Sequence, residues 1–369
     1  MTHPAPAEPG PARTALLNVR VFDGRRLTEP RTVVIDGGTV SRDTRTAGAR
    51  TVDGTGMTLL PGLIDAHVHL HGPDTLARLA AHGVTTALDM ATWPPQLLAD
   101  LRRVPGLTDI RSAGTPAVGA GGPHSHIPGM AQDAVVRSPQ QAGEFVAAQV
   151  SAGADYIKIV VEAPGEGGPD EQTIDALVAA ARTHGRKTVA HTATAGACTM
   201  ALDAGVDFLT HVPFDRPLLP ADITRAARQG RVWIPTLTMM EGTAAARGVP
   251  HAYRTARTNL AALHQAGVPI LAGTDANTQP GVPFQVRHGE SIHHELALLV
   301  DAGLTPAEAL RAATALPARS FGLDDRGAVS PGLRADLLLV DGDPLADIRA
   351  TRAVRRIWCA GAEQTPAAV

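Results

Sequence analysis

The sequence contains little cysteine, few aromatic residues and no concentration of positive charge. The two cysteines, Cys198 and Cys359, are far apart and form no C-x-x-C pattern, which excludes a disulfide framework and a cysteine-ligated zinc site and is typical of a reducing compartment. The 33 lysines and arginines are balanced by 36 acidic residues without a basic cluster, so we expect no nucleic-acid partner. No run of about 18 apolar residues is present, and we therefore expect no membrane span.

The first residues of the chain lack the features of a targeting segment. Residues 1–13 are rich in proline and alanine, with no cationic head and no apolar core, so they do not resemble a signal peptide. We expect a disordered tail here and a cytoplasmic protein. The 37 glycines and 29 prolines exceed the usual share of a globular chain but fall short of a low-complexity composition.

A recurring segment runs through the middle of the chain. It consists of an alanine-rich helical stretch, a glycine suited to a helix C-cap, and a short apolar run that ends in a polar residue. Copies occupy residues 79–89, 151–158 and 182–191, and further copies end at His211, Thr236 and Asp275. Helices that alternate with short apolar strands predict βα units around a parallel sheet.

Two more candidate strands, at residues 63–69 and 110–118, bring the number to eight. Eight βα units over this length predict an α/β fold of the (β/α)8 TIM barrel type, which we place at residues 62–320. The flanks carry short alternating runs with Asp-Gly turns instead. Residues 14–61 and 321–369 are therefore expected to pair into one small composite β-sandwich domain. A separate helix is predicted after Thr305, where a capping box is completed by Glu308.

Histidines lie at the predicted ends of several strands, where the chemistry of such barrels collects. His67 and His69 form a His-x-His pair, and because side chains alternate along a strand, both imidazoles are expected to point to the barrel interior. His191 and His211 end two further strands. Four imidazoles in these positions predict a site for zinc or a similar divalent ion, rather than four unrelated core histidines.

Lys158 lies in a strand that is otherwise apolar on both faces. A buried ammonium there needs a partner or a strongly lowered pKa. A deprotonated lysine can react with CO2 to give a carbamate, an anionic ligand able to bridge two ions. The alternative is a structural ion pair with Glu162 or Asp89. Asp275 ends the last predicted strand, where it can act as metal ligand and proton acceptor or, alternatively, as the N-cap of a following helix.

The motif Leu60-Pro61-Gly62-Leu63-Ile64-Asp65-Ala66-His67-Val68-His69 resembles the opening motif of the amidohydrolase superfamily. The resemblance extends through Gly273-Thr274-Asp275 to residues 332–337, and the ordered set His-x-His, Lys, His, His, Asp resembles the binuclear subtype with a carboxylated lysine. The Tyr-Ile-Lys-Ile strand is similar to that of the prolidase-like, ochratoxinase-like and imidazolonepropionase-related branch.

The resemblance implies two divalent metal ions, most simply Zn²⁺. It places His67, His69 and Asp275 on one ion, His191 and His211 on the other, and a CO2-derived carbamate on Lys158 as the bridge. The implied activity is hydrolysis of an amide bond, peptide-like or in an N-acyl amino acid, by a hydroxide that bridges the ions, with Asp275 as the catalytic base and acid.

Loop residues provide candidates for substrate binding. His124 and His126 lie close to a Gly-Gly-His segment of the prolidase-like relatives, and one of them could polarise the substrate carbonyl. Tyr253 and Arg254 lie between the last two predicted strands, where they could hold a substrate carboxylate. Arg287-His288 and His293-His294 follow the eighth strand and are further candidates, for which a solvated helix face is the simpler interpretation.

Other functions stay open at this point. The same centre could act on a lactone, an ester or a cyclic amide, and a biosynthetic cyclase or lyase could descend from the same site. A deaminase is disfavoured, because such relatives lack the lysine ligand. We expect a small-molecule substrate and a homo-oligomer.

Overall fold

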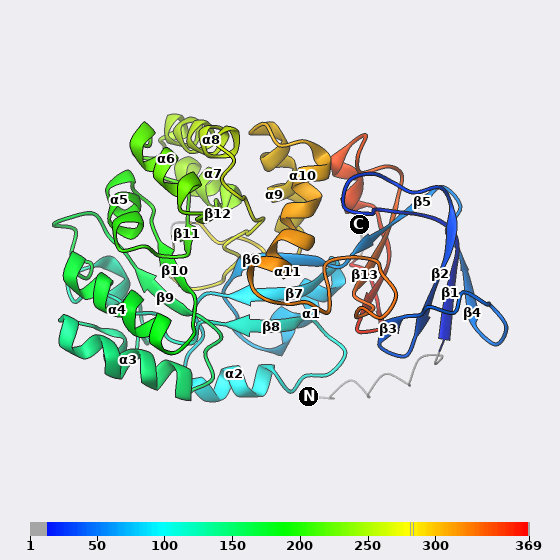
Figure 1. The fold of residues 1–369 in the computed structure, drawn as a ribbon, viewed down its shortest axis with the longest axis horizontal. Helices are drawn as coiled ribbons and strands as arrows, with labels where there is room; N and C mark the ends of the chain where they lie inside the picture. Colours follow the sequence, from blue (N-terminus) through cyan, green and yellow to red (C-terminus); the bar gives the residue numbers. More distant parts are fainter. Residues whose placement is uncertain (1–12, 281, 283, 368–369) are drawn as a thin grey trace.

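The computed structural model of the chain describes residues 13–280, 282 and 284–367. A mixed α/β region occupies the left of the molecule in Figure 1, and a sheet built from both ends of the chain lies on the right. The α/β region contains short parallel strands, each followed by at least one helix, as the recurring segment predicts. Its strands are β6 (Leu63–Val68), β7 (Val84–Asp89), β8 (Asp109–Ser112), β9 (Ile157–Val160), β10 (Thr188–His191), β11 (Phe208–Thr210) and β12 (Val232–Ile234).

The helices of this region range from one and a half to about four turns. They are α1 (Pro73–Ala81), α2 (Pro95–Leu101), α3 (Pro139–Ser151), α4 (Glu171–Thr183), α5 (Ala195–Asp203), α6 (Pro220–Arg228), α7 (Leu237–Ala246), α8 (Pro250–Gln265), α9 (Glu290–Asp301), α10 (Pro306–Ala312) and α11 (Ala315–Ser320). Glycines end several of them, as predicted: Gly83 and Gly185 have φ angles of 81° and 63°, which favour a residue without Cβ. The predicted capping box is confirmed, because Thr305 and Glu308 exchange side-chain to backbone hydrogen bonds at the start of α10.

The parallel strands form two sheets that backbone hydrogen bonds connect at both ends. One sheet has the order β6-β7-β8 and the other β12-β11-β10-β9. Beyond β8, the N–H of Ala117 donates to the carbonyl of Lys158 at 2.8 Å, and the N–H of Val160 donates to Ala117 at 2.8 Å. The predicted strand at residues 110–118 is therefore a shorter strand followed by an isolated bridge.

The predicted last strand is also less regular than expected. Residues 271–275 are not a regular strand, but they lie between β12 and β6 and bond to both. The N–H of Leu271 donates to Trp233 at 2.8 Å, and the N–H of Ala66 donates to Ala272 at 2.8 Å. Bridges at Ile270 and Ala276 flank the segment. It carries Asp275 to the neighbourhood of His67.

Strands from the two ends of the chain share one eight-stranded sheet. Strand β13 (Leu337–Asp341) pairs antiparallel with β5 (Met57–Pro61), in a register that sets Leu338 opposite Leu60. The remaining strands are β1 (Arg13–Val21), β2 (Arg31–Asp36), β3 (Thr39–Val40), β4 (Arg50–Asp53), β14 (Val354–Cys359) and β15 (Ala362–Gln364). Trp358, Leu59 and Leu16 belong to its buried core, so residues more than 300 positions apart in the chain exclude water together.

Two expectations concern the ends and the surface of the chain. The predicted tail at residues 1–12 lies outside the described residues, but Arg13 does not belong to a tail, because it begins β1 and pairs with Asp36. Among the described residues, no helix is long and apolar enough to cross a membrane.

Gly273 allows the segment that carries Asp275 to approach β6 closely. A Cβ at this position would lie 2.9 Å from the backbone N of His67 and 2.5 Å from a methyl carbon of Ile234. We expect Gly273→Ala to destabilise the fold by about 1–3 kcal/mol, because the backbones must separate. The measurement is the free energy of unfolding in urea.

Gly143→Ala is the matched control for this prediction. Gly143 lies within α3, and a Cβ there would have no heavy atom within 4 Å. This substitution should stabilise the protein by about 0.5–1 kcal/mol, because alanine favours the helix. Equal effects of the two substitutions would show that the close approach at Gly273 is not a constraint.

Candidate active site

The six residues predicted as metal ligands come together in one cavity of about 700 Å³. Each lies in or just after a parallel strand, or in the segment that replaces the eighth strand. The carboxyl ends of these strands meet at one end of the sheets, so the six side chains converge. They are His67 on β6, His69 after it, Lys158 on β9, His191 at the end of β10, His211 after β11, and Asp275.

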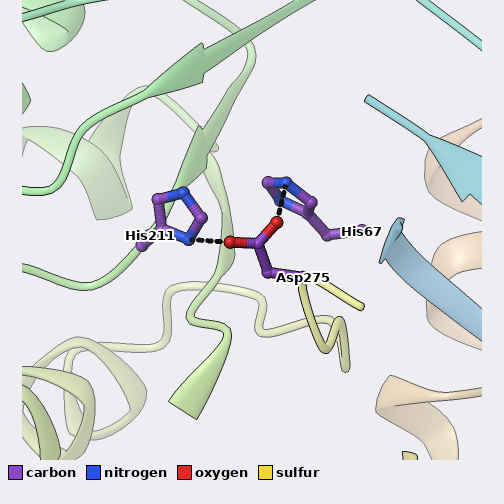
Figure 2. A group of neighbouring side chains, drawn as sticks. All are labelled: His67, His211 and Asp275. Carbon is purple, nitrogen blue, oxygen red and sulfur yellow. Dashed lines mark ion pairs between the residues drawn. The ribbon is translucent and has the colours of Figure 1, made fainter. Parts of the chain in front are cut away.

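The carboxylate of Asp275 is the centre of the first group. Its Oδ1 lies 3.2 Å from Nε2 of His67 and 3.0 Å from Nε2 of His69, and its Oδ2 lies 3.9 Å from Nδ1 of His211. Figure 2 shows the Asp275 carboxylate between the rings of His67 and His211. Burial opposes ionisation of Asp275, but its interactions with His67 and His69 hold the pKa of the carboxyl well below its usual value. Asp275 is therefore an anion at neutral pH.

A buried second carboxylate, Asp65, fixes the position of this group. Asp65 accepts hydrogen bonds from the backbone N–H of Thr274 at 3.0 Å, from Oγ1 of Thr274 at 2.7 Å, and from the N–H of His67 at 3.2 Å. The N–H of Asp275 in turn donates to the carbonyl of His67 at 2.8 Å. Burial raises the pKa of Asp65 to about 7 despite these bonds. The sequence motif contains Asp65, but its role as the link between two distant segments was not predicted.

His191 and His211 form the second group. Nδ1 of His191 lies 3.0 Å from Nε2 of His211. Burial lowers the pKa of His211 to about 3 and that of His191 well below its usual value, so both rings are neutral at pH 7. Oγ1 of Thr236 lies 2.5 Å from Nδ1 of His211. When that Nδ1 carries the proton and donates to Thr236, Nε2 keeps a lone pair that faces His191.

Lys158 is buried and lines the same cavity as the two groups. Within the described part of the chain, its Nζ has no hydrogen-bond partner. Burial lowers the pKa of Lys158 to about 7, although the charges of Asp275 and Asp89 favour the ammonium. The structural ion pair considered from the sequence is not formed. Glu162 instead lies 3.1 Å from Nδ1 of His124, and Asp89 accepts a hydrogen bond from the N–H of Leu70 at 3.1 Å.

The side chains of this site have the chemistry and spacing of metal ligands. Ligand atoms of His67, His211 and Asp275 all lie within 4.8 Å of one another, and all three residues are buried. Neutral imidazoles and an ionised carboxylate are the ligands that zinc prefers. A buried amine without a hydrogen-bond partner lowers the stability of the fold unless a bound group satisfies it. The unpartnered Nζ of Lys158 therefore also fits a site that a modification of the lysine and a metal would complete.

Of His124, His126 and Tyr253, which the sequence predicts to bind substrate, two line the cavity and one does not. His124 and His126 line the cavity on the short 3-10 helix η1 (Pro123–His126). Nδ1 of His126 lies 3.1 Å from the carbonyl of Gly122 in its own loop, whereas the ring centroid of His124 lies 4.5 Å from that of His191. Tyr253 does not line this cavity, because α8 turns it toward the hydrophobic core behind α7.

Several other residues differ from the expectations. Arg254 lines a separate shallow depression on α8 rather than the cavity. His288 and His293 do not lie on a solvated face, because both are buried and bond to backbone carbonyls of His69 and His82. Arg247, in contrast, lines the cavity and was not predicted. It follows α7 with no motif around it, so the sequence carried no signal for it.

The α/β fold and a cavity with four imidazoles, a carboxylate and a buried amine define a class, that of enzymes with a metal-dependent site at the ends of parallel strands. The model of the amidohydrolase family matches residues 58–363. The chain belongs to this family, whose members are metal-dependent hydrolytic enzymes that act on carbon–nitrogen bonds.

Three individual proteins illustrate what the chain is similar to. An uncharacterized protein of Mycobacterium tuberculosis is 30% identical over 373 residues, which cover 90% of this chain and 88% of the relative. The imidazolonepropionase of Deinococcus deserti is 41% identical over 103 residues, or 27% of this chain and 24% of that protein. A crystal structure of a Xaa-Pro dipeptidase with bound methionine shares the fold, with a TM-score of 0.83 over 95% of this chain and 99% of that chain, at 22% identity.

The lowered pKa of Lys158 predicts a specific pH dependence of stability in chelated protein. A lysine with a pKa of about 7 in the folded state and about 10.5 when unfolded costs most stability below pH 7 and nothing above pH 10.5. The free energy of unfolding of the wild type should therefore rise, relative to Lys158→Met, as the pH increases from 7 to 10. Urea unfolding of both proteins at several pH values measures this.

Lys187→Met is the control for the loss of one lysine. Lys187 is exposed, and its ammonium donates to the carbonyl of Ser320 at 2.9 Å. Parallel pH curves for the wild type and Lys158→Met would show that Lys158 is not a buried neutral amine in the folded protein.

Proposed function

We propose that the cavity holds two divalent ions, zinc in the simplest case. His67, His69 and Asp275 would hold one ion, and His191 and His211 the other. The neutral amine of Lys158 would add to CO2, forming a carbon–nitrogen bond and releasing one proton, and the resulting carbamate oxygens would bridge the ions. The burial of Lys158, its pKa of about 7 and its lack of a partner among the described residues support this modification.

We also propose that the parallel strands close into a (β/α)8 barrel over residues 62–320, with a small β-sandwich domain from residues 14–61 and 321–369. The support for the barrel is that backbone hydrogen bonds connect the two parallel sheets at both ends. Ala117 connects β8 to β9, and residues 269–276 connect β12 to β6. A closed barrel would direct all six ligand positions to one end, as the shared cavity requires.

The reaction that this site supports best is hydrolysis of an amide bond, peptide-like or in an N-acyl amino acid. The observation that carries the proposal is the ionised Asp275 carboxylate, which lies in contact with the imidazoles of His67 and His69 on one side and that of His211 on the other. When bound, divalent ions lower the pKa of water toward neutrality and polarise a carbonyl. Oδ2 of Asp275, the oxygen farther from His67 and His69, would accept the proton of the attacking water. It would then deliver that proton to the leaving nitrogen as the carbon–nitrogen bond breaks.

His124 is the loop histidine that can contribute to this reaction. Its Nδ1 donates to the Glu162 carboxylate at 3.1 Å, and Nε2 would donate to a substrate carbonyl when the ring carries both protons. Gly168 permits this arrangement, since a Cβ there would lie 2.9 Å from the Cβ of Glu162. His126 is held by its own loop and would shape the cavity wall.

Replacement of Lys158 separates its proposed role as a ligand from a structural one. Lys158→Ala should lose both bound metal and activity, because the bridging anion is missing. Acetate or propionate should restore part of both, since a free carboxylate can occupy the space of the carbamate. Elemental analysis and turnover on the same samples measure the effect, and wild-type enzyme with added acetate is the control. A variant that keeps wild-type metal content and rate would make Lys158 a structural residue.

The activity itself is tested with a panel of N-acyl amino acids, dipeptides, lactones and esters, with products identified by mass spectrometry. We expect the zinc-loaded enzyme to release an acid and an amine from amides. Asp275→Asn should lower kcat by roughly 10²–10⁴-fold at equal metal loading, because the proton acceptor is lost.

Two results would contradict this proposal. Asp275→Asn with full metal and wild-type kcat would exclude the proton shuttle. Turnover of lactones or esters without any amide, or a reaction that releases no hydrolysis product, would replace amide hydrolysis as the function.

A further inference from the structure

The cavity extends well beyond the candidate ligands along one face of helix α7. This helix begins after Thr236, whose hydroxyl contacts His211. Met239, Thr243 and Arg247 follow at intervals of four residues and all line the cavity. Residues with this spacing lie on the same helix face, so α7 presents a stripe that starts at the ligands and ends at Arg247.

The helix provides a measure of how far Arg247 lies from the ligands. Arg247 caps α7 with helical backbone angles, φ −84° and ψ −3°. Arg247 is eleven positions after Thr236, which corresponds to about 16 Å along a helix with a rise of 1.5 Å per residue. The guanidinium can reach back over only part of this length. The span between the ligands and Arg247 is therefore suited to a substrate segment longer than that of a dipeptide.

Arg247 brings a positive charge to the outer end of the cavity. Its Cζ lies 5.9 Å from the ring centroid of Phe214, which also lines the cavity. In the described part of the chain its guanidinium forms no ion pair, whereas the cavity carboxylates of Asp275 and Glu162 are engaged with histidines. Apart from the buried Lys158, it is the cation among the described cavity-lining side chains. A guanidinium over an aromatic face is well suited to bind a carboxylate with two hydrogen bonds.

Apolar side chains form much of the cavity wall apart from the ligands. They include Met239 on α7, Phe214 in the segment after β11, and Trp93, Ile127 and Met130 in the loops after β7 and β8. Contact with these apolar side chains favours an apolar substrate segment, because a charged or strongly polar one would lose hydration against them. At about 700 Å³, the cavity has the size of sites that enclose a ligand considerably larger than a dipeptide.

We propose that the substrates are amides in which an extended apolar segment separates the scissile bond from a terminal carboxylate, and that Arg247 binds this carboxylate. This inference rests on the proposed amide hydrolysis and names the substrate class of the same site. Substrate length would then be selected by the distance between the ligands and Arg247.

The test uses two series of amides on the zinc-loaded enzyme. One series contains N-acetyl ω-amino acids from N-acetylglycine to N-acetyl-12-aminododecanoate, and the other contains monoamides of α,ω-diacids of matching length. The value of kcat/KM should increase with chain length to an optimum. At that optimum, conversion of the terminal carboxylate to a neutral amide should lower kcat/KM by about 10–100-fold, as expected for a charge-assisted pair.

Arg247→Met should remove the difference between the carboxylate and the neutral amide, mainly through KM, because Arg247 lies far from the reacting atoms. Arg254→Met is the matched control, since Arg254 lies outside the cavity. Fastest turnover of N-acetylglycine, no dependence on length, or an unchanged preference in Arg247→Met would overturn the proposal.

A binding measurement separates this proposal from the proposed function. Trp93 lines the cavity, so its fluorescence can report the binding of dodecanedioate to chelated protein. Binding that Arg247→Met abolishes, together with no cleavage of any amide, would support the carboxylate site and contradict amide hydrolysis. Cleavage of amides with no binding of dodecanedioate would contradict the carboxylate site alone.

Discussion

The arrangement of the site depends on one carboxylate, that of Asp275. It lies within 3.2 Å of two imidazoles, one on β6 and one just after it, and within 3.9 Å of a third that follows β11 in the other parallel sheet. These contacts connect the two parallel sheets through side chains at the same end where their strands finish. Because the pKa of Asp275 is held low, the carboxylate keeps its charge in a buried place, and a cation is the natural complement to that charge.

Backbone contacts determine where this carboxylate lies. Gly273 allows the segment that carries Asp275 to lie against β6. Asp65 accepts hydrogen bonds from Thr274 in this segment and from His67 on β6, and the N–H of Asp275 donates to the carbonyl of His67. A single buried acid thus holds two motifs that are more than 200 residues apart in the chain. A glycine also permits a close contact elsewhere in the cavity wall. Gly168 leaves space for the side chain of Glu162, which lies in contact with His124.

Much of this arrangement could be predicted from the sequence. The alternation of strand side chains placed His67 and His69 on one face, and the polar residues at the ends of the recurring segments converge because parallel strands end together. Residues on helices and loops could not be placed in this way. Tyr253 and Arg247 both follow the same predicted strand, but the rotation of α7 and α8 about their axes decides which of them faces the cavity. The partner of His124 depended on contact between two glycine-rich loops, which no local pattern records.

Two ions on either side of Lys158 are the central proposal for this site, and anomalous diffraction from crystals of the zinc-loaded enzyme tests it most directly. We expect two zinc peaks, one among His67, His69 and Asp275 and one between His191 and His211, with density for a carbamate on Nζ of Lys158 between them. A single peak, zinc bound elsewhere, or an unmodified lysine with both ions in place would contradict the account.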